Sequence, residues 1–214
     1  MRFNNLKILE IGIGSIELPS LKLWKDYFPN SIIYGLDVEK DYIINTEDRI
    51  HTYLCNTLDK QDVDKIIKPL GFFDIIIDDG CHRCDGQQIT FCNFFKYLST
   101  NGIYIIEDCG SSFNTNYNFG NDIDCKNKSY QIGPPNKRIN IDMPEFIYSN
   151  IDKNRIDTTY NVFMNFNKIK KINSFYIENY ISNTEKESLE KQIKNIEYWQ
   201  GNNNTDSLII IYSN

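Results

Sequence analysis

The chain has 214 residues, of which 41% are hydrophobic and 24% charged, and its formal net charge is −6. This length suits one domain of roughly 100–250 residues. No apolar run approaches the roughly 18 residues that a membrane-spanning helix needs, and the first residues lack the apolar stretch of a signal peptide. The negative charge argues against a nucleic-acid-binding protein, because contact with phosphates requires clustered lysine and arginine.

The six cysteines do not form the pattern of a disulfide scaffold. Without a secretion signal we expect reduced thiols and a cytoplasmic protein. Cys81 and Cys84 form a C-x-x-C motif around His82, which a zinc site would also show. No second pair follows at zinc-finger spacing, so we do not predict structural zinc.

Short apolar runs alternate with helical patterns over the first half of the chain. The predicted strands are residues 6–11, 31–37, 50–55, 73–78 and 102–106, and the predicted helices are 18–28, 59–70 and 87–98. This alternation is typical of βαβ crossovers, so we expect an α/β fold with a doubly wound, mostly parallel sheet. Such sheets bind ligands at the carboxyl ends of their strands.

The sequence changes in character after Asp108. Residues 109–150 are rich in Gly, Asn, Ser and Pro and begin at the carboxyl end of a strand, which predicts a lid over a site. We expect residues 169–181 and 207–213 to form a late antiparallel strand pair, with a charged helix over 185–199 between them. Repeats and linkers are absent from the sequence, so we predict a single domain over residues 1–214.

A glycine-containing motif ends the first predicted strand. Residues 10–14 read Glu-Ile-Gly-Ile-Gly and lead into a helix, and such glycines let backbone amides approach a ligand. Glu17 stands where the dinucleotide fingerprint has its third glycine, so a simple tight turn is an equal explanation. Asp37 ends the second strand, where a carboxylate can accept hydrogen bonds from a ribose.

Acidic residues follow the fourth and fifth predicted strands. Asp79, Glu107 and Asp108 should converge, because these two strand ends are neighbours in a doubly wound sheet. Converging carboxylates repel one another, and a bound divalent ion such as Mg²⁺ relieves that repulsion. The alternative is that some of these acids cap the following helix or loop.

A histidine lies beside this predicted acidic cluster. His82 follows Asp79 by three residues, and histidine titrates near neutral pH, which suits a general base. The alternative is a structural histidine, and we adopt that interpretation for His51, which lies in a half-polar strand away from the cluster.

Together these motifs resemble class I S-adenosylmethionine-dependent methyltransferases, and more narrowly the metal-dependent sugar O-methyltransferases of the macrocin and mycinamicin type. The matching segments are residues 9–14, 20–29, 34–37, 78–82, 87–88 and 102–108. Glu107 follows Asp79 by 28 residues, a spacing similar to the metal site of catechol-type O-methyltransferases. That family has its base three residues after the first metal ligand, the position of His82.

The resemblance implies a Rossmann-like fold, S-adenosylmethionine and Mg²⁺ (or Mn²⁺) as cofactors, and a role for each matching residue. The implied cofactor-binding residues are Glu10, Gly12, Gly14, Ser20, Asp37, Asn56 and Asp78. The implied metal ligands are Asp79, Glu107 and Asp108, and the implied catalytic residues are His82, as general base, and Asp79. Asn56 stands where the family has an aspartate near the adenine, and Cys81 replaces its usual serine.

The function that follows is methyl transfer to a hydroxyl of a sugar or glycan, for example a deoxysugar such as rhamnose. Two alternatives stay open: a catechol-like diol as substrate, or a non-catalytic S-adenosylmethionine-binding module. The lid aromatics either pack on sugar rings or form the lid's own core; they are Phe113, Tyr117, Phe119 and Tyr130. The chain starts almost at strand one, so we expect a trimmed enzyme or a module of a longer polypeptide, for example one with glycosyltransferase-type domains.

Overall fold

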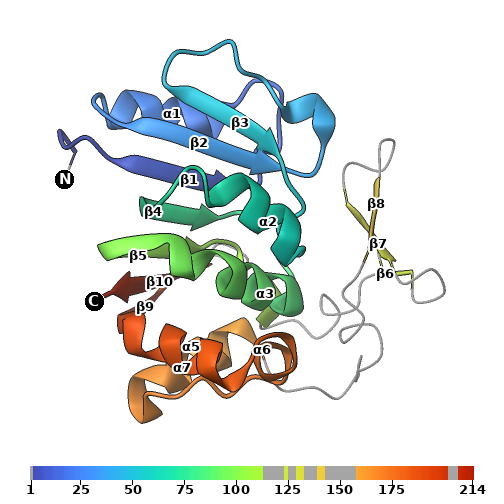
Figure 1. Ribbon diagram of the computed structural model, residues 1–214, viewed down its shortest axis with the longest axis vertical. Coiled ribbons are helices and arrows are strands. Elements are labelled where there is room, and N and C mark those ends of the chain that lie inside the picture. The colour runs from blue at the N-terminus through green and yellow to red at the C-terminus, as the bar shows by residue number, and fades with distance from the viewer. Residues whose placement is uncertain (1, 113–122, 125–128, 133–138, 143–157, 202–206) are drawn as a thin grey trace.

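The main body of the protein is a twisted sheet covered by helices, as the computed structural model shows (Figure 1). The structure describes residues 2–112, 123–124, 129–132, 139–142, 158–201 and 207–214. The seven strands of the sheet lie in the order β3-β2-β1-β4-β5-β10-β9. They are β1 (Lys7–Ile11), β2 (Ile32–Asp37), β3 (Ile50–Leu54), β4 (Phe73–Asp78), β5 (Leu98–Ile106), β9 (Ile193–Gln200) and β10 (Ser207–Ser213).

The pairing of these strands confirms the predicted doubly wound, mostly parallel sheet. Strands β1 to β5 pair in parallel, whereas β10 pairs antiparallel with both β5 and β9. The chain runs outward from β1 to β3 and then crosses back to β4, so the order reverses between β1 and β4. The edge position of β3 agrees with the polar alternation of its sequence.

Helices cover both faces of the sheet. Helix α1 (Pro19–Tyr27) packs on one face, where Leu21 joins Ile8, Ile33 and Ile75 in a buried cluster. The opposite face carries α2 (Lys60–Ile67), α3 (Cys84–Phe94), α5 (Thr159–Ile169), α6 (Phe175–Tyr180) and α7 (Asn183–Gln192) (Figure 1). Among the described residues, none of the helices combines the length and apolarity needed to cross a membrane.

Short 3₁₀ helices and a second small sheet complete the described elements. The 3₁₀ helices are η1 (Lys40–Tyr42), η2 (Phe95–Tyr97) and η3 (Cys109–Ser112). Strands β6 (Ile123–Asp124), β7 (Ser129–Ile132) and β8 (Ile139–Asp142) pair antiparallel within the predicted lid. Apart from these strands and η3, the segment lies outside the described residues, and this includes Phe113, Tyr117 and Phe119; the side chain of Tyr130 is not described either. The lid therefore stays a prediction.

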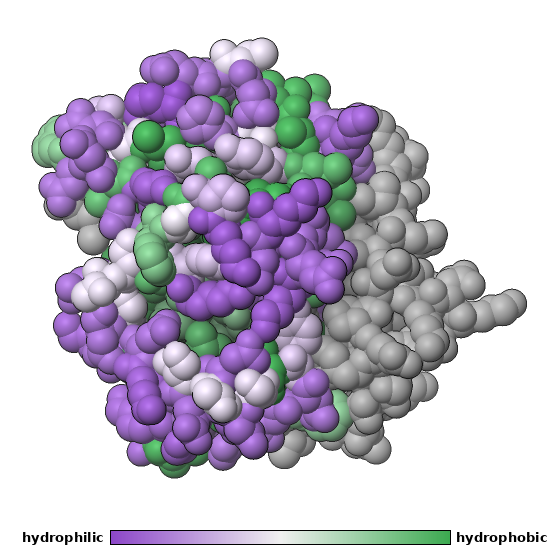
Figure 2. Space-filling view, in the orientation of Figure 1, coloured by the Kyte–Doolittle hydropathy of each residue, from purple (hydrophilic) through white to green (hydrophobic). Residues whose placement is uncertain are grey.

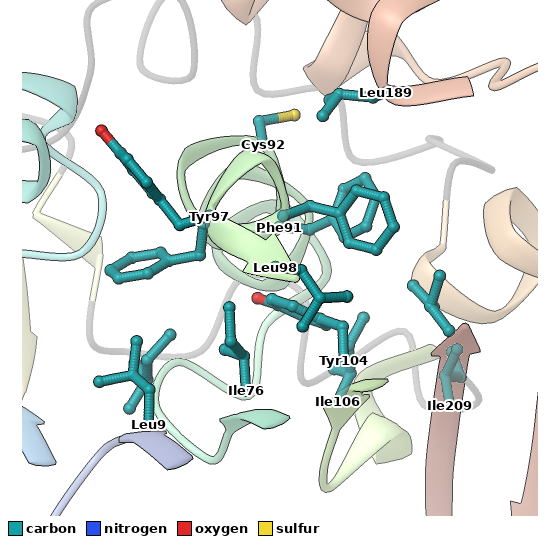
Figure 3. Packing of buried hydrophobic residues seen from close by; sticks show 14 of the residues in the cluster. Leu9, Ile76, Phe91, Cys92, Tyr97, Leu98, Tyr104, Ile106, Leu189 and Ile209 are labelled. Carbon is teal, nitrogen blue, oxygen red and sulfur yellow. The ribbon is translucent and has the colours of Figure 1, made fainter. Parts of the chain in front are cut away.

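Helix α3 is enclosed by the rest of the fold. All its residues are buried, because it packs between the sheet and helices α5 and α6. The ring of Phe91 contacts the rings of Phe95, Tyr104 and Phe163. Figure 3 shows side chains of β1, β4, β5 and β10 pointing toward this helix. The face of the molecule formed by α2, α3 and α5 to α7, seen in Figure 2, is largely hydrophilic toward solvent, as expected for a well-covered core.

The strand predicted over residues 169–181 is wrong. The chain there completes α5 and then forms α6. Lys170 has a left-handed backbone (φ 54°) that ends α5, and the Ser174 hydroxyl accepts a hydrogen bond from the Ile177 amide, which caps α6. The apolar residues Ile172, Tyr176 and Ile177 are buried with helical spacing, which resembles a strand pattern over so short a stretch.

The helix predicted over residues 185–199 is half correct. Helix α7 ends at Gln192, and residues 193–200 form β9, the actual antiparallel partner of β10. Ile196 pairs with Ile211 and Tyr198 with Ile209, so long-range pairing outweighs the local helical pattern. The late antiparallel pair exists, but with β9 as its first member.

Helix α3 also begins at Cys84, three residues before the predicted start.

The cysteines that the structure describes are free thiols. They are Cys55, Cys81, Cys84, Cys92 and Cys109. Burial raises the pKa of the Cys81 thiol. A Cβ on Gly86 would lie 2.3 Å from the Cys81 sulfur, so this thiol packs directly against α3.

Candidate functional site

The carboxyl ends of the central strands lie in one row. Ile11 pairs with Leu36 and with Asp78, and Asp78 pairs with Ile106. The amide of Asp79 donates to the Ile11 carbonyl at 2.9 Å, and the amide of Glu107 donates to the Asp78 carbonyl at 2.9 Å. The residues that follow each strand therefore share one edge, at the point where the strand order reverses and α/β sheets bind their ligands.

The glycine turn after β1 lies against the end of β4. The Gly12 amide donates to the Leu36 carbonyl at 2.8 Å, and Gly12 has a φ of +93°. A Cβ at this position would lie 2.2 Å from the Asp79 carbonyl oxygen, so only glycine permits the approach. Gly14 has a φ of +68°, but a Cβ there would have no heavy atom within 4 Å. The turn thus packs on Asp79 at one end and faces open space at the other.

Asp37, at the end of β2, orders this turn. Its Oδ2 accepts hydrogen bonds from the amides of Ile13 (2.8 Å) and Gly14 (3.2 Å), and its Oδ1 accepts one from the Glu39 amide (2.8 Å). Each carboxylate oxygen has two lone pairs, so Oδ2 is fully used and Oδ1 keeps one site for a ligand hydroxyl. Sequence reasoning assigned Asp37 to the ribose; the structure adds this role within the loop.

Asn56 lies in the loop after β3. Its side-chain oxygen accepts from the Leu58 amide at 3.1 Å, and its own amide donates to Asp62 Oδ2 at 2.7 Å. These bonds order the loop that enters α2. Its predicted contact with the adenine stays a prediction.

Glu10, on β1, is buried against α1, with only 2% of its surface exposed. Its two carboxylate oxygens accept hydrogen bonds from the Ser20 hydroxyl and from the indole N–H of Trp24. Burial raises the pKa of Glu10 to about 7. Glu10 and Ser20 thus bond to each other and join α1 to β1, and their predicted contact with the cofactor stays a prediction. Trp24 belongs to a matching segment, yet sequence reasoning gave it no role.

Two acids and a histidine meet at the ends of β4 and β5. Asp79, His82 and Asp108 each offer one ligand atom within 4.8 Å of the other two. Asp79 is half-buried, and burial, together with the charge of Asp108, raises its pKa to about 6. Asp108 has a left-handed backbone with a φ of 50°, which aspartate tolerates better than most residues.

Glu107 lies beside this group but outside it. Burial, followed by the charges of Asp79 and Asp108, raises the pKa of Glu107 to about 7, whereas His82 lowers it. Glu107, a predicted metal ligand, is therefore close enough to interact with Asp79, His82 and Asp108. His82, the predicted base, is itself a member of the group.

Asp78 lies behind the cluster, within the sheet. It is 1% exposed, and its Oδ2 accepts a hydrogen bond from the Tyr104 hydroxyl at 3.2 Å. Burial raises the pKa of Asp78 to about 8, so a neutral carboxyl is favoured at this position. Its predicted contact with a cofactor stays a prediction.

The donor set at this edge fits a divalent cation. The carboxyl groups of Asp79 and Glu107 have raised pKa values because they are partly buried next to other acids, and a cation would remove that cost. Carboxylate oxygens suit Mg²⁺ and Mn²⁺, and the imidazole of His82 also suits a transition metal. The nearby C-x-x-C thiols are not part of the group.

Sequence comparison relates part of the chain to curated methyltransferases, although no protein-family model matches it. It is 35% identical over 122 residues to 8-demethyl-8-(2-methoxy-alpha-L-rhamnosyl)-tetracenomycin-C 3'-O-methyltransferase of Streptomyces olivaceus, covering 55% of this chain and 31% of that protein. It is 36% identical over 118 residues to mycinamicin VI 2''-O-methyltransferase of Micromonospora griseorubida, covering 52% of this chain and 29% of that protein. The resemblance to macrocin- and mycinamicin-type enzymes is confirmed over about half of this chain and less than a third of those relatives.

Structural comparison confirms the class I methyltransferase fold. The MycE methyltransferase from the mycinamycin pathway, in complex with Mg and SAH, aligns over 99% of this chain and 46% of that chain, with a TM-score of 0.63 and 22% identity. An O-methyltransferase from Bacillus cereus in complex with SAH aligns over 97% of this chain and 74% of that chain, with a TM-score of 0.54 and 13% identity. At these identities the likeness establishes the fold, which is Rossmann-like.

Gly12→Ala should destabilise the protein more than Gly14→Ala. Both positions need a left-handed backbone, which costs an alanine about 1–2 kcal/mol. Only the alanine at position 12 overlaps the Asp79 carbonyl, which adds about 1–3 kcal/mol. Urea unfolding measures both variants, and equal losses of free energy would contradict the close approach of the turn to β4.

Glu10→Gln should change the pH dependence of stability. The folded pKa of Glu10, about 7, lies above its ordinary value of 4.5, so its contribution to stability is present below about pH 4.5 and is lost as pH rises through 7. Relative to the variant, the wild type should lose up to about 3 kcal/mol between pH 4 and pH 8. Urea unfolding in EDTA at several pH values tests this, and a pH-independent difference would contradict it.

Proposed function

We propose that this chain is the S-adenosylmethionine-binding and methyl-transferring part of an O-methyltransferase that acts on a sugar hydroxyl with the help of Mg²⁺ or Mn²⁺. One observation carries the proposal: Asp79, His82 and Asp108 gather beside the glycine turn. They do so in a chain that is 32–36% identical, over about half its length, to curated O-methyltransferases whose substrates bear sugars.

The methyl donor would bind along the turn after β1 and the end of β2. The open space beside Gly14 leaves room for a ligand next to backbone amides. Asp37 Oδ1 retains one acceptor site for a ribose hydroxyl. Glu10 would stabilise this surface indirectly, because its hydrogen bonds to Ser20 and Trp24 hold α1 against β1. The donor's sulfonium would then lie near Asp79, since Gly12 packs on the Asp79 backbone.

The acidic cluster would hold the divalent ion through Asp79 and Asp108, with Glu107 as the third carboxylate. When bound, such an ion stabilises negative charge on a hydroxyl oxygen. The pKa values of Asp79 and Glu107 are raised because both acids are half-buried beside other acids, so a bound ion would replace the protons that these carboxylates hold near neutral pH.

His82 would remove the proton of the attacking hydroxyl. Its side chain is exposed, so a sugar can reach it, and it lies within 4.8 Å of the acidic ligand atoms, next to the place where the oxygen would be held. As the new C–O bond forms, the methyl group leaves the donor sulfur, the proton passes to the imidazole, and the donor becomes S-adenosylhomocysteine. A neutral sugar needs no basic surface, which agrees with the net charge of −6.

The direct experiment is a methyl-transfer assay with labelled S-adenosylmethionine. The panel contains mono- and oligosaccharides, rhamnose among them, and catechol as the competing diol, each with and without EDTA. Transfer to a sugar that EDTA abolishes supports the proposal. Transfer to catechol alone would favour the small-diol alternative, and donor binding without any transfer would favour a non-catalytic module.

Asp79→Asn should lower methyl transfer more than about 100-fold and leave the affinity for S-adenosylhomocysteine unchanged. The amide keeps the shape of the side chain but removes the charge that holds the ion. Asp74→Asn is the matched control, because Asp74 lies near the start of β4, the strand that Asp79 follows, and accepts from the Lys7 amide at 2.9 Å, away from the cluster. Calorimetry and the transfer assay measure both variants; equal loss of donor binding and turnover in Asp79→Asn would contradict the metal assignment.

His82→Gln should lower the transfer rate by roughly 10²–10⁴ without weakening Mn²⁺ binding, because a base acts on the substrate proton and not on the ion. The control is His51→Gln on the edge strand β3, which should not change the rate. Single-turnover kinetics and Mn²⁺ calorimetry distinguish the roles. A loss of Mn²⁺ affinity in His82→Gln would make His82 a metal ligand instead of the base.

A further inference from the structure

Gln87 reaches from helix α3 to the backbone of the acidic cluster. We propose that Gln87 is a positioning residue that fixes Glu107 and Asp108 in the arrangement required for metal binding. The inference rests on the proposed function, because it presumes that the cluster holds a divalent ion.

The contacts of the Gln87 side chain join it to both residues after β5. Gln87 is the fourth residue of α3 and is 1% exposed. Its amide nitrogen donates to the Glu107 carbonyl at 3.0 Å and lies 3.5 Å from the Asp108 carbonyl. One buried NH₂ group therefore contacts the carbonyl of Asp108, a member of the cluster, and that of Glu107, which lies beside the cluster.

The segment held in this way lies beyond the regular ladder of the sheet. The pairing of β5 with β4 and with β10 ends at Ile106. Asp108 then has a left-handed backbone, which costs an L-residue about 1–2 kcal/mol. The Gln87 amide lies against the carbonyls on both sides of the Asp108 Cα, and this contact stabilises the turn. The conformation of the turn determines where the carboxylates of Glu107 and Asp108 point.

The Gln87 amide is itself held in one orientation. Its oxygen accepts from the Thr159 hydroxyl at 2.9 Å, and that hydroxyl also lies 3.4 Å from the Cys84 carbonyl. Thr159 is fully buried at the start of α5. With its oxygen fixed by a hydroxyl donor, the amide must present its nitrogen to Glu107 and Asp108.

The next residue provides an internal contrast. Gln88 is also fully buried on α3, but its side-chain oxygen accepts from the Ser174 hydroxyl at the start of α6. It therefore belongs to the packing of α3 against α6, whereas Gln87 belongs to the packing of α3 against the cluster. The same substitution at the two positions separates a general loss of helix packing from a specific loss at the metal site.

The test is Mn²⁺ calorimetry on the wild type, Gln87→Met and Gln88→Met. Methionine has a similar length but no hydrogen-bond donor and only a weak acceptor, and it adds no charge near the ion. Removing a group that orients a metal ligand weakens binding about 10–100-fold, so Gln87→Met should bind Mn²⁺ that much more weakly, with unchanged affinity for S-adenosylhomocysteine. Gln88→Met should bind Mn²⁺ as the wild type does. Equal Mn²⁺ affinity in Gln87→Met and wild type, or equal losses in both variants, would overturn the role of Gln87.

A second variant decides the matter if Gln87→Met does not fold. Thr159→Val removes only the hydroxyl that orients the amide, so it should weaken Mn²⁺ binding in the same direction but less. Unchanged Mn²⁺ affinity in Thr159→Val would then overturn the inference. If the wild type itself binds no Mn²⁺, the proposed function fails and this inference fails with it, an outcome distinct from an unchanged Gln87→Met.

Discussion

The arrangement of this protein depends on like charges held together at the ends of two neighbouring strands. Backbone hydrogen bonds from Asp79 to Ile11 and from Glu107 to Asp78 fix the strand ends, so the backbones that carry the acidic side chains stay close together. Their pKa values rise because they are partly buried beside one another. The fold bears a cost here that a divalent cation would remove, and this is the physical basis of the proposed chemistry.

The elements around the cluster keep that geometry in place. Helix α3 is buried on all sides, so its side chains form a firm support behind the ends of β4 and β5. The glycine turn packs directly on the Asp79 backbone, which puts the proposed donor surface next to the proposed metal site. In the proposed function, the row of strand ends would bring two separate requirements of methyl transfer, a bound donor and a polarised hydroxyl, to one edge of one sheet.

The sequence predicted this edge well because its signals are local. Strands β1, β2 and β4 and the second half of β5 are apolar runs, and Asp79 and Glu107 directly follow β4 and β5, so the parallel topology alone brings these two residues to one edge. The last third of the chain was predicted poorly, because β9 exists only through its pairing with β10, and α6 depends on a cap at Ser174. The contact of Gln87 with Thr159 joins residues far apart in the chain, and no local pattern reveals it.

The most direct test of this account is a crystal structure of the protein with Mn²⁺ and S-adenosylhomocysteine, measured at a wavelength where manganese scatters anomalously. We expect an anomalous peak between the carboxylates of Asp79 and Asp108, at bonding distance from both, with the nucleoside beside the turn at Gly12 and Gly14. A peak elsewhere, or none at this edge at saturating Mn²⁺, would contradict it.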